Sequence, residues 1–269
     1  MRKPIRIGAL ISGGGTNLQA IIDACEQGRI DGQMVAVGSD VDGVRGLERA
    51  RNHHIPTFVV DYGAIIRRYR QAPEQLSPPE DFDLDRIRAQ QSLFSPQADP
   101  AKVAAFLITR AVAESRLLAQ LADFEVDLLV LAGFMRNLTP YFIDRFNPDA
   151  DHPRIMNIHP ALLPSFPGVD GYGDTFRYGC KVGGCTVHFI DYGEDSGPII
   201  GQKAFLIREG DDLAAVKKNG LEMEWQLYPE CIQLFAEGRL HVVTMTHTLD
   251  SGALYQRRVV RIAQTDTAR

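Results

Sequence analysis

The stretch Arg6-Ile7-Gly8-Ala9-Leu10-Ile11-Ser12-Gly13-Gly14-Gly15-Thr16-Asn17-Leu18 decides the fold of the first half of the chain. It begins as a short apolar run, which indicates a buried β-strand, and passes through three glycines into a segment with helical spacing. This helical segment covers 17–27, where the apolar residues recur on one face: Leu18, Ile21, Ile22 and Cys25. A strand, a glycine turn and a helix in this order predict the start of a parallel βαβ unit.

The same alternation continues along much of the chain. Strand-like runs lie at 34–39 and 56–60, and a helical segment lies between them at 44–52. Beyond residue 100, helical and strand-like segments alternate again, at 102–122, 127–132, 140–146 and 154–158. This alternation predicts an α/β fold with a Rossmann-like, mostly parallel sheet flanked by helices.

Residues 61–100 interrupt the pattern. They contain five prolines and an acidic stretch, which are typical of a surface excursion rather than of a regular element. We predict an insertion here, with short helices at 64–70 and 84–91. Because no linker or internal repeat divides the chain, residues 1–269 are predicted to form a single domain.

The C-terminal part differs from the parallel first half. The runs at 181–190 and 199–206 predict an antiparallel extension of the sheet, and 212–237 predicts a long final helix. The tail, about 241–269, holds two β-rich runs on either side of Asp250-Ser251-Gly252, which is typical of a hairpin. No role for this tail follows from the sequence.

Composition argues against several classes of function. The formal net charge of −5 disfavours a protein that binds nucleic acid by neutralising many phosphates. No run approaches the roughly 20 apolar residues that a membrane helix needs, and no signal-peptide core follows Met1, so we expect a cytoplasmic protein. The four cysteines form no CxxC pair, which favours reduced structural thiols and predicts no metal site.

The glycine loop after the first strand predicts a phosphate site. Glycines let the backbone approach a ligand, and the start of a helix supplies free N–H groups and partial positive charge. The alternative is a tight turn with Thr16 or Asn17 as the helix cap. No lysine follows Gly15, as a Walker A motif requires, and Leu18 stands where the dinucleotide fingerprint has its third glycine. Asp40 could still serve as a ribose-binding acid, so NAD binding is a weaker alternative.

Two polar residues with chemical potential lie at the end of the predicted strand 154–158. Alternation along an extended chain places Asn157 and His159 on one side and Ile158 on the other. Ligands bind at the carboxyl ends of strands in open α/β sheets. An amide donor and a titratable imidazole could therefore share a site.

A second segment, 187–198, runs from a predicted strand into an acidic loop. A carboxylate in this loop could orient His159 and favour its protonated form. The residues alone do not choose among the candidates Asp191, Glu194 and Asp195.

At these positions the chain resembles the folate-dependent formyltransferases. The resemblance covers about 6–60 and 102–240, and within the family it is greatest to enzymes of purine synthesis that formylate phosphoribosylglycinamide. It rests on five blocks: Ile11-Ser12-Gly13-Gly14-Gly15-Thr16-Asn17-Leu18-Gln19, Leu131-Ala132-Gly133-Phe134-Met135-Arg136, Asn157-Ile158-His159-Pro160-Ala161-Leu162-Leu163-Pro164, Thr186-Val187-His188-Phe189 and Asp195-Ser196-Gly197-Pro198. One block alone would be a weak signal, whereas five in the correct order are specific.

The resemblance implies that Asn157, His159 and Asp195 are the catalytic residues. An amine would attack the formyl carbon and create a tetrahedral oxyanion, which the Asn157 amide and a protonated His159 would stabilise. His159 could also help move the proton from the attacking amine to the departing folate nitrogen while Asp195 holds the imidazolium. No tightly bound cofactor is implied, because 10-formyltetrahydrofolate is consumed as a cosubstrate.

The resemblance also implies binding residues. Gly15, Thr16 and Asn17 match the loop that holds the phosphate of the amine substrate, and Glu224 matches a glutamate that contacts this substrate. The positions that match the folate pocket are Arg110, Met135, Arg136, Asn137 and Leu138. The implied partners are a phosphorylated amine and folate, without nucleic acid or membrane, and a homodimer is left open.

Three features depart from the family. In the segment 169–174, Tyr172 stands where the family usually has a histidine, which puts the acceptor in doubt. The insertion 61–100 is longer than usual, and the tail beyond residue 240 is atypical.

Other activities are weighed against formylation of phosphoribosylglycinamide. A formyltetrahydrofolate deformylase would usually have a second histidine where Pro160 stands, and a methionyl-tRNA formyltransferase a basic, tryptophan-containing segment after Pro164. A related formyltransferase that acts on another amine, such as an amino sugar nucleotide, stays open. So does a non-catalytic nucleotide-binding module of the same fold, which would tolerate His159→Ala.

Overall fold

The centre of the molecule is a seven-stranded sheet, seen in a computed structural model that describes residues 3–264. Its strands are β1 (Ile5–Ile11), β2 (Gly32–Ser39), β3 (Thr57–Val59), β4 (Leu128–Leu131), β5 (Ile155–His159), β6 (Val182–Phe189) and β7 (Ile199–Leu206). Their order is β3-β2-β1-β4-β5-β6-β7, with parallel pairs as far as β5 and antiparallel pairs beyond it. The predicted α/β fold, mostly parallel with an antiparallel C-terminal extension, is confirmed.

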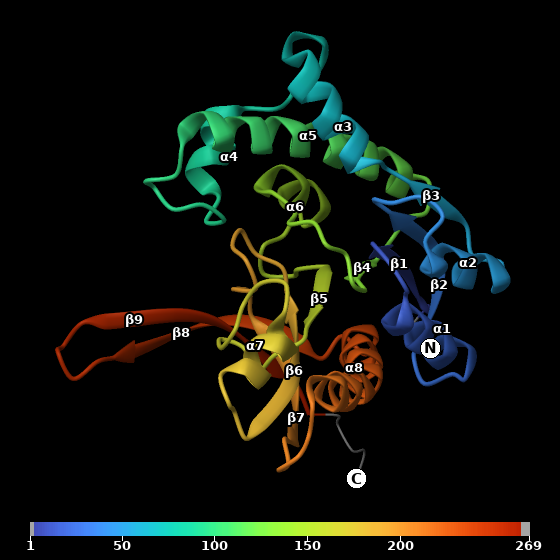
Figure 1. Cartoon of the computed structure of the whole chain (residues 1–269), viewed down its shortest axis with the longest axis vertical. Helices are drawn as coiled ribbons and strands as arrows, with labels where there is room; N and C mark the ends of the chain where they lie inside the picture. Colours follow the sequence, from blue (N-terminus) through green and yellow to red (C-terminus); the bar gives the residue numbers. More distant parts are fainter. Residues whose placement is uncertain (1–2, 265–269) are drawn as a thin grey trace.

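Helices cover both faces of this sheet (Figure 1). They are α1 (Thr16–Glu26), α2 (Arg45–Asn52), α3 (Tyr62–Gln71), α4 (Leu84–Gln90), α5 (Pro100–Ala122), α6 (Pro140–Phe146), α7 (Gly171–Arg177) and α8 (Leu213–Ala236), with a 3-10 turn η1 (Pro73–Gln75). The apolar sides of α1, α2 and α8 pack on one face, and those of α3, α5 and α6 pack on the other. The strand order changes direction in sequence between β1 and β4, and ligands bind at such a switch point.

Aspartates mark where several helices begin. Asp61, Asp83, Asp99 and Asp212 each accept a hydrogen bond from a backbone N–H in the first turn of α3, α4, α5 and α8, respectively. Such caps satisfy N–H groups that have no partner within the helix. This local chemistry explains why the sequence boundaries of these helices lie close to the observed ones.

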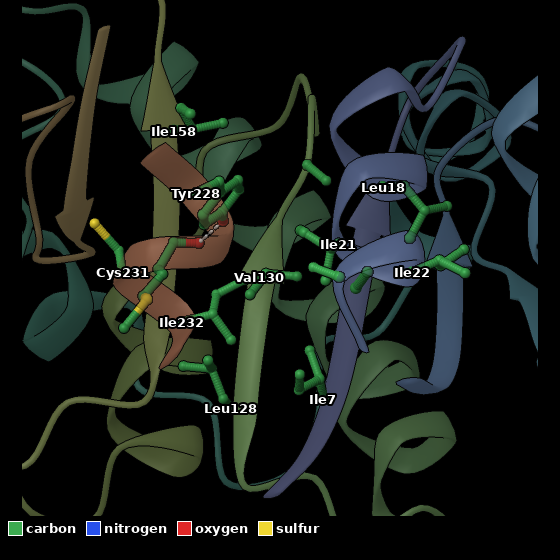
Figure 2. Close-up of a cluster of buried hydrophobic side chains, with 14 of the residues drawn as sticks. Ile7, Leu18, Ile21, Ile22, Leu128, Val130, Ile158, Tyr228, Cys231 and Ile232 are labelled. Carbon is green, nitrogen blue, oxygen red and sulfur yellow. Dashed lines mark hydrogen bonds between the residues drawn. The ribbon is translucent and has the colours of Figure 1, made fainter. Parts of the chain in front are cut away.

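The core between α1, α8 and the sheet is apolar, and the Tyr228 hydroxyl makes hydrogen bonds within it. Ile7, Val130 and Ile232 meet in it, and Figure 2 shows them with Tyr228 beside them. The Tyr228 hydroxyl is fully buried and donates to the carbonyls of Leu131 (3.2 Å) and Met156 (2.9 Å). Tyr228 thereby ties α8 to β4 and β5, the strands that lead into the site.

The insertion is helical, as predicted, and it packs on the rest of the molecule. Ile87 of α4 is buried against Val103, Leu107 and Tyr141 of α5 and α6. Together α3, α4 and α5 form the arch of helices at the top of Figure 1. The 3-10 turn η1 and the short helix α7 were not predicted. In α7 two of the seven residues are glycines, which have poor helix propensity.

The tail forms the predicted hairpin. Strands β8 (Leu240–Thr248) and β9 (Leu254–Ile262) pair antiparallel as a separate two-stranded sheet. In Figure 1 this hairpin projects from the body of the molecule, and the turn between β8 and β9 lies farthest out. Across residues 3–264, no helix is both long and apolar enough to cross a membrane.

A buried carboxyl joins α5 to the start of α6. Glu114 is 0% exposed and accepts hydrogen bonds from the Thr139 backbone N–H (2.8 Å) and hydroxyl (2.6 Å). Burial raises the pKa of Glu114 to about 7, although both hydrogen bonds act in the opposite direction. The folded protein therefore holds this proton to a higher pH than the unfolded chain does.

We expect Glu114→Gln to remove one part of the pH dependence of stability. Because the folded pKa lies above the unfolded one, the contribution of Glu114 is fully present below the unfolded pKa of about 4.3 and is lost as pH rises through the folded pKa. When the pH rises from about 5 to about 8, the free energy of unfolding of the wild type should fall by on the order of 2 kcal/mol more than that of the variant. Denaturant unfolding at a series of pH values measures this difference. Parallel pH profiles of the two proteins would contradict this assignment.

Candidate active site

A cavity of about 450 Å³ lies at the carboxyl ends of the central strands, and we call it the main cavity because Asn157, His159 and Asp195 line it. Its walls come from α1, α5, the segments after β4 and β5, the start of α7, the loop after β6, and α8. The lining residues are Asn17, Arg110, 133–135, Asn137, 157–160, 168–172, 194–195, Lys217, Leu221 and Glu224. The cavity therefore brings together segments that the sequence separates by up to about two hundred residues.

His159 is the buried titratable group at the end of β5. It is 2% exposed, with Nδ1 3.1 Å from Asp195 Oδ2 and Nε2 2.8 Å from the Phe166 carbonyl oxygen. Both ring nitrogens face acceptors, so the doubly protonated ring satisfies both contacts. Burial acts to lower the pKa of His159, but the hydrogen bond and negative charge of Asp195 outweigh it and raise the pKa above its usual value.

Asp195 is the carboxylate that meets this histidine. Its Oδ2 also accepts from the Gly168 N–H (2.8 Å), and its Oδ1 lies 3.6 Å from His188 Nε2. Burial acts to raise the pKa of Asp195, but the hydrogen bonds from His159 and His188 dominate and hold it well below its usual value. Both pKa shifts therefore favour an ion pair of the Asp195 carboxylate and the His159 imidazolium.

The other two acidic candidates of this loop make their hydrogen bonds with residues other than His159, although Glu194 also lines the main cavity. Asp191 Oδ1 accepts from the Gly193 N–H (3.1 Å) and the Ser196 hydroxyl (2.6 Å), and so shapes the turn. Glu194 is exposed and lies 3.5 Å from Asn137 Nδ2. The geometry distinguishes three carboxylates that the sequence could not rank.

Asn157 lies on the same cavity wall as His159. Its Nδ2 is 3.4 Å from Nε2 of His188, which is 1% exposed and stands opposite Asn157 in the β5–β6 pairing. His188 was not assigned a role from the sequence, although it lies in one of the recognised blocks. The antiparallel register places it beneath Asn157 and Asp195, and this register has no signature within a single strand.

Glu224 on α8 is the centre of a second buried polar group. It is 4% exposed; Oε2 accepts from Asn17 Nδ2 (2.6 Å) and Oε1 from the Tyr172 hydroxyl (2.6 Å). Burial raises the pKa of Glu224 despite these two hydrogen bonds. The Tyr172 ring fits against Gly220, where any Cβ would overlap it.

The residues of the glycine loop differ in their position relative to the main cavity. Gly15 has a left-handed φ of 69°, and a Cβ there would lie 2.7 Å from the Gly46 Cα, so this turn requires glycine. Asn17 lines the main cavity, whereas Thr16 lines a neighbouring hollow with Arg49 and Trp225. Gly15 and Thr16 are therefore adjacent to the main cavity but are not on its wall.

Arg110 is a buried cation on the cavity wall. It is 6% exposed, its guanidinium lies over the rings of Tyr62 (5.0 Å) and Phe106 (4.5 Å), and burial lowers its pKa. Among residues 3–264, no hydrogen-bond partner is found for its Nε and Nη1 atoms. A buried guanidinium with free donors is suited to bind an anionic group of a ligand.

The segment after β4 is divided between cavity and core. Met135, which is 58% exposed, and Asn137 line the main cavity. Leu138 is 4% exposed and belongs to the apolar core, and Arg136 Nε donates to Asp40 (2.6 Å). Neither Arg136 nor Leu138 is on the wall of the main cavity, and the folate-binding role that the resemblance implies for them stays a prediction.

The same contact removes the basis for a dinucleotide site at Asp40. Its carboxylate is 1% exposed and is shared between Ser12 (2.5 Å) and Arg136. It therefore ties together the loops after β1, β2 and β4 instead of facing a ribose. No group of three or more His, Cys, Asp or Glu side chains that could hold a metal occurs in the described part of the chain.

The fold and the cavity together define an α/β protein with an ion-paired histidine at a topological switch point. The sequence profile described as formyl transferase matches residues 5–232. The chain belongs to this formyl transferase family.

Similar proteins agree with this membership. Phosphoribosylglycinamide formyltransferase of Escherichia coli is 32% identical over 93% of this chain and 96% of that protein. The crystal structure of glycinamide ribonucleotide transformylase 1 from Symbiobacterium toebii matches with a TM-score of 0.70 and 36% identity, over 98% of this chain and 96% of that one. The human trifunctional purine biosynthetic protein adenosine-3 is 31% identical over 90% of this chain, which spans only 19% of that protein's length.

Proposed function

We propose that this protein transfers the formyl group of 10-formyltetrahydrofolate to the amine of phosphoribosylglycinamide, within de novo purine biosynthesis. The observation that carries the proposal is the buried His159–Asp195 ion pair, with Asn157 on the same wall of the main cavity. Relatives named for this reaction align over nearly the whole chain, which supports the same acceptor. We also propose that residues 1–269 act as one formyltransferase domain.

Asn157, His159 and Asp195 are the proposed catalytic residues. Attack of the amine on the formyl carbon places negative charge on the formyl oxygen, and the Asn157 amide and the His159 imidazolium supply donors for that oxygen. In the free protein the Nε2–H of His159 faces the Phe166 carbonyl, so the substrate oxygen must compete for this donor. Asp195 keeps the ring charged and oriented.

Proton transfer completes the reaction. The attacking amine loses a proton, the bond between the formyl carbon and the folate nitrogen breaks, and that nitrogen gains a proton. His159 is a titratable group on the cavity wall, and it can release and regain one proton in the cycle. The products are the formylated amine and tetrahydrofolate.

The two ends of the cavity support a division between the substrates. Arg110 offers free donors to a carboxylate, which folate carries, and Met135 and Asn137 lie on the wall near it. Asn17 and Glu224 lie toward the start of α1, where N–H groups favour a phosphate and a carboxylate can accept from hydroxyls. We assign the phosphorylated amine to this second end, with Gly15 and Thr16 as backbone contributors.

A second acceptor deserves a test because of one observation. Tyr172 occupies one oxygen of Glu224, the proposed acceptor ligand, at a position where the family usually has a histidine. A related amine acceptor such as an amino sugar nucleotide would use the same catalytic residues with this altered contact.

Spectrophotometric assays with a panel of acceptors test the proposal. Conversion of 10-formyltetrahydrofolate to tetrahydrofolate is followed with phosphoribosylglycinamide, with an amino sugar nucleotide, and with no acceptor. We expect turnover only with phosphoribosylglycinamide. Turnover with only the sugar nucleotide would show that this compound is the acceptor. Equal turnover without any amine would show that the protein hydrolyses 10-formyltetrahydrofolate and does not transfer its formyl group.

A further inference from the structure

The middle of strand β9 in the C-terminal hairpin contacts the loop that carries Asp195. Arg257 of β9 is half-buried, and its Nη2 donates to the Ser196 carbonyl oxygen (2.6 Å) and lies 3.4 Å from the Gly197 carbonyl oxygen. Both carbonyls directly follow Asp195 in the chain. A segment sixty residues away in sequence therefore holds the backbone next to the proposed catalytic carboxylate.

This loop has a demanding conformation. Asp195 has a left-handed φ of 49°, which is unfavourable for a residue other than glycine and persists only where the surroundings fix it. Gly197 is packed so closely on the Phe189 carbonyl that a Cβ would overlap it. Small displacements of the loop are therefore opposed on one side by the sheet and on the other by Arg257.

The consequence reaches the histidine through short contacts. Asp195 Oδ2 is 3.1 Å from His159 Nδ1 and accepts from the Gly168 N–H, so a shift of the backbone at Ser196 changes both distances. The Asp195 side chain has only two rotatable bonds, so it can compensate only partly for a shift of its own backbone. The middle of the hairpin thus supports the backbone on which the site depends.

We propose that Arg257 is a positioning residue for formyl transfer: by holding the Ser196 and Gly197 carbonyls, it keeps Asp195 on His159. The inference rests on the proposed function and adds a role for the hairpin, to which the sequence assigned none. The charged groups that face His159 are Asp195, from the loop after β6, and Glu224, from α8; His188 of β6 faces Asp195. Arg257 acts on the first of these contacts only.

Three variants distinguish a role of Arg257 in positioning Asp195 from a role that only attaches the hairpin to the rest of the protein. Arg257→Met keeps an apolar stem of similar length and removes the guanidinium, and Arg257→Lys returns one charged donor. Arg258→Met is the matched control, because the neighbouring Arg258 donates to the Ala150 carbonyl and lies 3.4 Å from Asp151 Oδ1, away from the cavity.

The readouts are the pKa of His159, from NMR titration of labelled histidine, and the steady-state constants. In Arg257→Met we expect this pKa to fall by roughly half a unit to one unit, because a displaced Asp195 stabilises the imidazolium less. We expect kcat to fall about tenfold with little change in either KM, and Arg257→Lys to recover part of both losses. Arg258→Met should match the wild type in both.

The pKa of His159 tests the positioning role of Arg257, and the activity of the wild type tests the proposed function. If Arg257→Met and Arg258→Met lower the free energy of unfolding alike and leave the His159 pKa unchanged, Arg257 only attaches the hairpin and the inference is wrong. If the pKa falls as expected but the wild type transfers no formyl group, the proposed function fails while the positioning contact stands. Should Arg257→Met not fold, Arg257→Lys against Arg258→Lys gives the same comparison of pKa values.

Discussion

Replacing His159 by alanine should lower kcat for formyl transfer by about 10²–10³-fold, the loss typical for one donor to a developing oxyanion. The imidazolium is held by Asp195 within a buried site, where a charged donor is more effective than in water. Neither KM should change by a comparable factor, because the donor is needed for the charge that appears only in the transition state. Steady-state kinetics under saturating folate and amine measure this directly.

A matched histidine supplies the control. His152 is exposed and pairs with Asp149 at the surface, with Nδ1 2.6 Å from Oδ2, far from the cavity wall. His152→Ala should retain wild-type kcat. If both variants are equally active, His159 is not a catalytic residue and the function must be sought elsewhere in the fold.

The pH dependence of kcat follows from the same pair. Transfer needs the protonated ring, and Asp195 raises the pKa of His159 above its usual value, so kcat should decline only as pH rises through that raised pKa. Asp195→Asn removes the negative charge and should move the decline to lower pH. A profile that is unchanged in Asp195→Asn would separate the ion pair from the chemistry.

The second large effect is expected from a single methyl group on α8. In Gly220→Ala the new Cβ overlaps the Tyr172 ring, so the ring must leave its place or the helix must shift. We expect a loss of about 1–3 kcal/mol in the free energy of unfolding, as for overpacked cores. The Tyr172 bond to Glu224 is lost with it, so the KM for the amine should rise about tenfold, with a smaller change in the folate KM.

Two companions test the mechanism of this loss. Gly63→Ala adds a methyl group in helix α3, where the nearest atoms are a flexible arginine and the Asp61 side chain, and should leave both KM values unchanged. Tyr172→Ala is itself destabilising, because Tyr172 is buried, but it removes the ring that the new methyl group would overlap. In the Tyr172→Ala background, Gly220→Ala should therefore cost little further stability. A cost as large as in the wild type would show that Tyr172 is not what the methyl group displaces.

Much of the fold was readable because it depends on local signals. Apolar runs, helical spacing and turn residues placed nearly every element, including the insertion helices and the final hairpin, and the structure adds Asp caps at the starts of several of these helices. One exception, α7, shows the limit: Gly171 and Gly173 argue against a helix locally, and the close approach of Gly171 to Pro160 that favours them is a tertiary contact. Local propensity cannot report such a contact.

The site was partly readable for a similar reason. Alternation along β5 placed Asn157 and His159 on one wall, but the choice of Asp195 over Asp191 and Glu194 depends on the path of a loop. The roles implied by resemblance for these residues stay predictions until variants are measured.

Long-range polar contacts could not be predicted from the sequence. Arg136 and Asp40 lie ninety-six residues apart, and their ion pair holds Arg136 off the wall of the main cavity and leaves Asp40 no free oxygen for a ribose. Arg257 and the Ser196 carbonyl are a further case, because a backbone acceptor has no sequence signature. Contacts of this kind follow only from the assembled fold.

The most direct test of the central claim is the destination of the formyl carbon. The protein is incubated with phosphoribosylglycinamide and 10-formyltetrahydrofolate that carries a carbon-13 label in its formyl group, and the products are identified by NMR and mass spectrometry. We predict that the label appears in the amine substrate as a formamide, in equal amount to the tetrahydrofolate released, and that His159→Ala loses this signal. Label recovered as free formate, or remaining on the folate while the amine is bound, would contradict formyl transfer by this site.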